Sequence, residues 1–111
     1  MIFSEMETLK ELHHENIVRI FKWFSLRNSQ LAYVMEYMQG GELLGVVQDK
    51  GTLSEEEARE YFVQILNAIN YCHRKRLIHR DLKLENILLE SKEGKKIKVA
   101  LEIVNFEVYL H

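Results

Sequence analysis

The chain has no proline, one cysteine and no long apolar run, and each absence excludes a class of protein. Cys72 has no partner for an internal disulfide, and the histidines lack the two-plus-two ligand spacing of a zinc site. No apolar stretch approaches the roughly 20 residues of a membrane-spanning helix. No N-terminal segment has the pattern of a signal peptide. We therefore expect no membrane association and a cytoplasmic protein, with the nucleus as the alternative.

An excess of charge of one sign is also lacking. The net charge is -2, which argues against a dedicated nucleic-acid binder. Hydrophobic residues make up 47% and charged residues 29%, a globular composition. With 111 residues, no repeat and no linker-like segment, the chain is one domain or a piece of one.

Apolar periodicity and turn signals predict an α+β fold. The expected elements are a helix over 1–14, strands over 17–24 and 31–37, a short helix over 42–49, a long helix over 54–76, and a strand over 87–89. Ser54 and Glu57 have the spacing of a capping box at the start of the long helix. Its apolar positions recur at helical spacing and are Ala58, Tyr61, Phe62, Ile65, Ala68, Ile69 and Cys72.

The most informative motif is the run I-H-R-D-L-K-L-E-N-I-L-L over residues 78–89. Asp81 and Asn86 are five positions apart, with Lys83 between them, on a short polar stretch flanked by apolar residues. This spacing suits a phosphoryl-transfer site, and the run matches the pattern H-R-D-L-x-x-x-N at every fixed position. The alternative, a solvated polar turn between a helix and a strand, requires a match of this length to be accidental.

Over residues 1 to about 100 the chain resembles a serine/threonine protein kinase, because Lys83 follows Asp81 by two positions in D-L-K-x-x-N. The stretch 51–89 is similar to the calcium/calmodulin-dependent and AMP-activated groups. The resemblance implies a partial kinase-like fold whose parts are a small-lobe remnant over 1–37, a hinge over 36–41, a large-lobe portion over 42–100 and a divergent tail over 101–111. It also implies ATP and Mg²⁺ as cofactors and a protein serine or threonine as substrate.

The resemblance gives each residue of the motif a role. Asp81 orients the substrate hydroxyl and accepts its proton, and Lys83 neutralises charge on the transferring phosphoryl group. Asn86 holds a magnesium ion through its amide oxygen. His79 has a structural role in holding the backbone of the loop.

The segment 33–38 resembles the kinase hinge that meets the adenine ring. Backbone groups of Glu36 and Met38 then bond the ring, Met35 guards the back of the adenine pocket, and Leu88 lies under the ring. The alternative is an edge strand that leaves a sheet, with Leu88 as an ordinary core residue.

Two acidic residues complete the implied nucleotide site. Glu42, which follows Gly40-Gly41, matches the residue that meets ribose. Glu5 lies eleven positions before Asn16, and the regulatory helix of kinases carries a glutamate at this distance ahead of an H-P-N-I-V motif. Here the motif reads H-E-N-I-V over 14–18. In the family this glutamate pairs with a strand lysine; a lone glutamate on a helix is otherwise solvated surface.

The chain departs from the family pattern in three places. It contains no G-x-G-x-x-G loop and no V-A-I-K lysine ahead of the first helix, and Leu101 stands where kinases have the aspartate of Asp-Phe-Gly. Losing one charge-stabilising group costs on the order of 10²- to 10³-fold in rate. We therefore expect a serine/threonine kinase by family that is inactive or nearly so in this form. The alternative is a truncated pseudokinase, a non-catalytic module with a partner that covers its exposed apolar faces.

Overall fold

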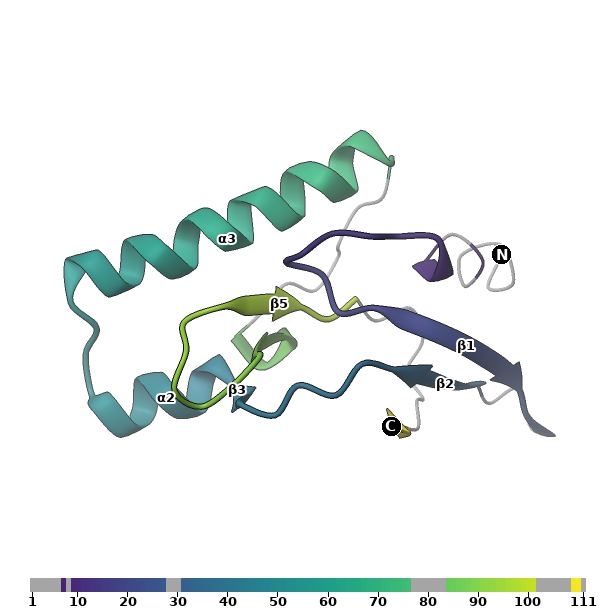
Figure 1. Cartoon of the computed structure of the whole chain (residues 1–111), viewed down its shortest axis with the longest axis horizontal. Helices are drawn as coiled ribbons and strands as arrows, with labels where there is room; N and C mark the ends of the chain where they lie inside the picture. Colours follow the sequence, from purple (N-terminus) through teal and green to yellow (C-terminus); the bar gives the residue numbers. More distant parts are fainter. Residues whose placement is uncertain (1–6, 8, 28–30, 77–83, 102–108, 111) are drawn as a thin grey trace.

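The computed structural model describes residues 7, 9–27, 31–76, 84–101 and 109–110. Within these residues the chain forms two α-helices, a short 3-10 helix (Leu84–Asn86) and two three-stranded sheets (Figure 1). The predicted α+β fold is therefore confirmed.

The first sheet contains the two strands expected from the N-terminal part of the sequence. β1 (Ile20–Ser25) and β2 (Leu31–Met35) pair antiparallel, with Trp23 opposite Tyr33. β6 (Tyr109–Leu110) pairs parallel with β2, so the strand order is β1-β2-β6. Both predicted strands are confirmed with shifted ends, since β1 starts three residues after Ile17 and β2 stops at Met35.

The second sheet brings together strands from both sides of the long helix. β3 (Gly41–Glu42), β4 (Ile87–Leu89) and β5 (Ile97–Val99) pair antiparallel in that order. Leu88 lies opposite Glu42 on one side and Lys98 on the other. Leu89 and Ile97 are the most deeply buried large side chains of the described residues.

Helices α2 (Leu43–Lys50) and α3 (Glu55–Arg74) confirm the two expected helices of this region. The predicted capping box begins α3, because the Ser54 hydroxyl accepts from the Glu57 N–H at 3.1 Å and the Glu57 carboxylate accepts from the Ser54 N–H at 3.2 Å. In Figure 1, α3 runs alongside β5, and these two elements are in contact.

The apolar stripe predicted for α3 is only partly buried. Tyr61, Ala68 and Cys72 pack with Ile97 and Val99 of β5. Ala58 and Phe62, two other members of the stripe, are exposed. The reason is that α3 packs through one narrow side against the sheet. The apolar side chains that project away from that side, and are 46–58% exposed, are Phe62, Val63 and Leu66.

The helix predicted over 1–14 is wrong at its C-terminal end. Residues 7, 9 and 10 are helical, Glu11 is in a turn, and residues 12–14 are not helical. The ring nitrogen Nδ1 of His14 accepts from the Asn16 N–H at 3.0 Å, and the His14 carbonyl accepts from the Ile17 N–H at 3.1 Å. This turn lies after the end of the helix, and Asn16 within it is buried.

Two apolar clusters form the core of the described residues. The β1–β2 cluster consists of Leu9, Leu12, Val18, Ile20, Tyr33, Met35, Met38 and Ala100. The α3 cluster consists of Ile17, Leu43, Tyr61, Ala68, Cys72, Ile87, Leu89, Ile97 and Val99. Half-buried Tyr71 and Leu101 pack against both clusters, so they join the two parts of the core. Neither described helix is both long and apolar enough to span a bilayer.

Candidate nucleotide site

Residues 36–40, the crossover segment, connect the first sheet to the second and contain Glu36 and Met38, two of the four residues assigned to adenine. Met35 at the end of β2 and Met38 in the crossover segment are both buried in the β1–β2 cluster. Leu88, which comes from β4 some fifty residues later, packs against the same cluster. The structure therefore brings together the three apolar side chains assigned to the adenine pocket.

The backbone of the crossover segment is held at three points, one of which is the bond from the Gly40 N–H to the Leu89 carbonyl at 3.0 Å. The Glu36 N–H donates to the Arg19 carbonyl at 2.9 Å, and the Met38 carbonyl accepts from the Gly41 N–H at 3.2 Å. The Glu36 carbonyl and the Met38 N–H are not hydrogen-bonded to any other described residue. One acceptor and one donor are thus left for a planar ligand beside the apolar side chains, an arrangement typical of small-molecule pockets.

Glu42, the residue assigned to ribose, follows the crossover segment in β3. It is exposed, and in the register of β3 and β4 it is the direct partner of Leu88, so the two side chains project from the same face. Glu42 lines an open pocket of about 560 Å³ that lies over α2 and to which Met35, Met38 and Leu88 do not contribute. Its lining residues include Gly40, Glu42, Gly45, Asp49 and Lys92.

The catalytic-loop motif is only partly described. Asn86 is buried at the end of the 3-10 helix, and its carbonyl accepts from the Ala100 N–H at 2.8 Å. Asp81, Lys83 and His79 lie outside the described residues, as does Glu5. The roles assigned to these side chains stay predictions.

The described residues around Asn86 do not by themselves supply a magnesium site, and the assignment of Asn86 as a magnesium ligand stays a prediction. Mg²⁺ requires several hard oxygen ligands, and the side chain of Leu101 offers none while it packs against both apolar clusters. The described residues contain no group of three or more His, Cys, Asp or Glu side chains that could hold a metal. Asn86 alone is an insufficient donor set, so we derive no step through this ion.

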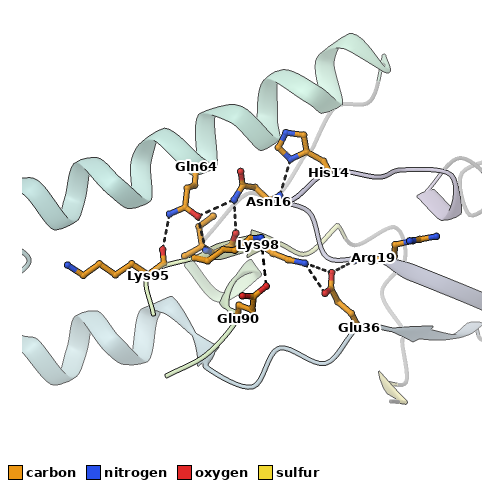
Figure 2. A network of polar contacts seen from close by, with 10 residues as sticks. His14, Asn16, Arg19, Glu36, Gln64, Glu90, Lys95 and Lys98 are labelled. Carbon is orange, nitrogen blue, oxygen red and sulfur yellow. Dashed lines mark hydrogen bonds and ion pairs between the residues drawn. The ribbon is translucent and has the colours of Figure 1, made fainter. Parts of the chain in front are cut away.

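A buried polar network, missed by sequence reasoning, anchors the turn before β1 (Figure 2). The Asn16 side-chain nitrogen donates to the Gln64 side-chain oxygen at 3.1 Å and to the Ile97 carbonyl at 3.0 Å. The same Gln64 oxygen accepts from the Ile97 N–H at 2.9 Å. The H-x-N-I-V pattern was the available signal for Asn16, whereas nothing in the sequence marks Gln64.

A second set of contacts in Figure 2 reaches the crossover segment. The Glu36 carboxylate accepts from the Arg19 N–H at 2.8 Å and from the Lys98 ammonium at 2.9 and 3.0 Å. Sequence reasoning gave Lys98 no role, because its partner lies 62 positions away.

Comparison with known sequences gives consistent matches. The family model described as "Protein kinase domain" matches residues 1–106. CBL-interacting protein kinase 31 from Oryza sativa subsp. japonica is 44% identical over 96 residues, and serine/threonine-protein kinase SRK2C from Arabidopsis thaliana is 46% identical over 95 residues. Each alignment covers 86% of this chain, but only 21% and 27% of those two proteins, respectively.

A solved structure supports the same conclusion for the fold. Rad53 residues 1–466, in complex with AMP-PNP, match with a TM-score of 0.83 and 37% identity. The match covers 89% of this chain and 26% of that one. The predicted partial kinase-like fold is therefore confirmed, while the division into small-lobe, hinge and large-lobe ranges stays a prediction.

Proposed function

Because this chain belongs to the protein kinase family and its relatives include serine/threonine kinases, we propose that it forms the adenine-nucleotide site and catalytic loop of a serine/threonine kinase domain. The domain moves the γ-phosphoryl group of ATP to a serine or threonine hydroxyl of a protein substrate. The observation that carries this proposal is the packing of Met35, Met38 and Leu88 around a crossover segment with an available acceptor and donor.

In this proposal Asp81 positions the substrate hydroxyl and takes its proton. A carboxylate suits the task because phosphoryl transfer passes through a loose transition state that needs positioning more than strong basicity. Lys83, two positions later, offsets the charge that develops on the transferring group. We place the protein in the cytoplasm, with the nucleus as the alternative.

Leu101 sets the expected rate. An apolar side chain packed between the two clusters supplies no charge where kinases have an aspartate. The loss of one such group reduces turnover by on the order of 10²- to 10³-fold, from the ~1–100 per second of typical kinases. We therefore propose a domain that binds adenine nucleotides and transfers phosphoryl groups weakly.

A second candidate function is a non-catalytic binding module, and the packing of Leu101 favours it. The exposed side chains of Phe62, Val63 and Leu66 on α3 then form the surface that a partner covers. This candidate predicts no phosphoryl transfer and no magnesium-dependent change in melting temperature with ATP.

Titration of the protein with ATP, first in EDTA and then in magnesium, tests the proposal. Wild type should bind ATP in both, and Leu88→Gln should weaken binding about tenfold or more through loss of the apolar floor. The matched control is Leu66→Gln, which changes an exposed leucine of α3 and should bind like wild type.

A phosphotransfer assay with Asp81→Ala then separates the two candidates. ATP binding that is absent, or equal in both leucine variants, would refute the nucleotide site.

A further inference from the structure

The ion pair between Glu36 and Lys98 differs from the other ion pairs of the described residues. The Lys98 ammonium lies 2.9 and 3.0 Å from the two carboxylate oxygens, and the side chains are 12% and 24% exposed. In every other described ion pair the lysine or arginine is at least 42% exposed. Exposed ion pairs contribute little to the stability of a fold. A carboxylate that is shielded from solvent and bonded through both oxygens is held firmly in place.

Glu36 also links this pair to β1. Its N–H donates to the Arg19 carbonyl while its carboxylate accepts from the Arg19 N–H, so the two residues form a reciprocal pair. Figure 2 shows Lys98 and Arg19 approaching the Glu36 carboxylate from different sides. The first residue of the crossover segment is therefore fixed to both sheets, through Arg19 just before β1 and Lys98 on β5.

Lys98 also lies beside Leu88, the other residue assigned to the adenine site. It is the direct β5 partner of Leu88 on β4. Directly opposed residues of antiparallel strands project from the same face. One lysine thus bonds the residue that begins the crossover segment and adjoins the residue assigned to the floor of the adenine pocket.

We propose that Lys98 is a positioning residue for the adenine site. By binding the Glu36 carboxylate, Lys98 holds the backbone of residues 36–38 at a fixed separation from Leu88. The inference rests on the proposed nucleotide site. Lys98 itself contacts no nucleotide in this account, so its effect passes entirely through Glu36.

The test compares Lys98→Met, Lys98→Arg and Lys96→Met in the protein. Lys96 is the matched control, because it lies two residues earlier and pairs with Glu90 between exposed side chains. The measurements are ATP affinity and hydrogen exchange of the Glu36 N–H. Lys98→Met should weaken ATP binding about tenfold, the effect expected when a charge-assisted hydrogen bond is lost. The same variant should speed exchange at Glu36, and Lys98→Arg should restore most of both.

The possible outcomes distinguish a failure of the positioning role of Lys98 from a failure of the proposed nucleotide site. If wild type binds no ATP, the nucleotide site is refuted, and Glu36 exchange that differs between Lys98→Met and Lys96→Met still shows that Lys98 holds the backbone of residues 36–38. If Lys98→Met only lowers the melting temperature, with exchange and affinity like those of Lys96→Met, the positioning role is refuted. Should Lys98→Met not fold, Glu36→Gln keeps an acceptor for Arg19, removes the charge that binds Lys98, and is judged by the same two readouts.

Discussion

The side-chain nitrogen of Asn16 donates to the carbonyl of Ile97 across 81 positions of sequence, at 3.0 Å in a fully buried bond. Because Ile97 begins β5 and Gln64 of α3 accepts from the same nitrogen, one amide ties the turn before β1 to the second sheet and the long helix. This contact sets where β1, and with it the crossover segment, lies relative to Leu88.

Replacement of Asn16 by alanine should therefore lower the free energy of unfolding. The Ile97 carbonyl loses a buried donor, and such a loss costs about 1–3 kcal/mol. Urea unfolding measures the change, with Asn70→Ala as the control because Asn70 is exposed on α3. Equal midpoints for the two variants would contradict the anchoring role.

Glu57 should make stability depend on pH in the acidic range. Its hydrogen bond from the Lys50 ammonium, with a smaller effect of the Ser54 N–H, lowers the pKa of this carboxyl from 4.5 to about 2. A carboxyl whose pKa is lower in the folded state stabilises the fold above its unfolded pKa, and the stabilisation is lost as the pH falls through the folded value. The affected window is therefore about pH 4.5 down to 2.

Melting temperatures over this range check the prediction. Wild type should exceed Glu57→Gln most near pH 5, and the difference should shrink toward pH 2. Glu56→Gln removes a neighbouring exposed carboxylate and should show no such trend. A difference between wild type and Glu57→Gln that is independent of pH would be evidence against the ionised bond.

Gly40, the last residue of the crossover segment, should not tolerate alanine. A β-carbon there would lie 2.6 Å from the Leu89 β-carbon and 2.7 Å from the Ser91 backbone. We expect a loss of about 1–3 kcal/mol, as for other overpacked sites. Gly45→Ala in α2 is the control, since no atom lies within 4 Å of its β-carbon. That variant should gain roughly 0.5–1 kcal/mol, and a neutral Gly40→Ala would contradict the close approach.

Leu101→Asp distinguishes a weak kinase from a non-catalytic module. A carboxylate placed against both apolar clusters should lower stability by about 1–3 kcal/mol. In a weak kinase the same change should raise the rate of magnesium-dependent phosphoryl transfer by on the order of 10²-fold. Leu101→Asn should lower stability to a similar extent but raise the transfer rate less, because an amide carries no charge. No gain in transfer for a folded Leu101→Asp favours the non-catalytic module.

The sequence predicted best those features that depend on neighbouring residues. The start of α3 follows from Ser54 and Glu57 three positions apart, and the strand over 87–89 follows from a short apolar run after a polar loop. The end of the first helix was missed because the turn after it contains Asn16, whose contact with Ile97 lies 81 positions away in the sequence.

Some residues of the candidate site could likewise be predicted from the sequence, and others could not. The apolar residues assigned to the adenine site were selected by family resemblance, since Met35 and Leu88 occupy motif positions, and this assignment stays a prediction. The ion pair of Lys98 with Glu36 was not recognised, because its partners lie 62 positions apart and neither residue type is unusual for a surface. Exposed apolar faces were expected, but helical periodicity does not reveal how wide the surface beneath a helix is, so it could not single out Phe62 as exposed.

The central claim is that an adenine nucleotide binds between the crossover segment and Leu88. Methyl NMR during an ATP titration measures this most directly, because Met35, Met38 and Leu88 all carry methyl groups. The account predicts that these three sets of signals shift together with one dissociation constant, while those of exposed Leu66 on α3 stay in place. Saturation by ATP with no shift at Met35, Met38 and Leu88 would contradict it.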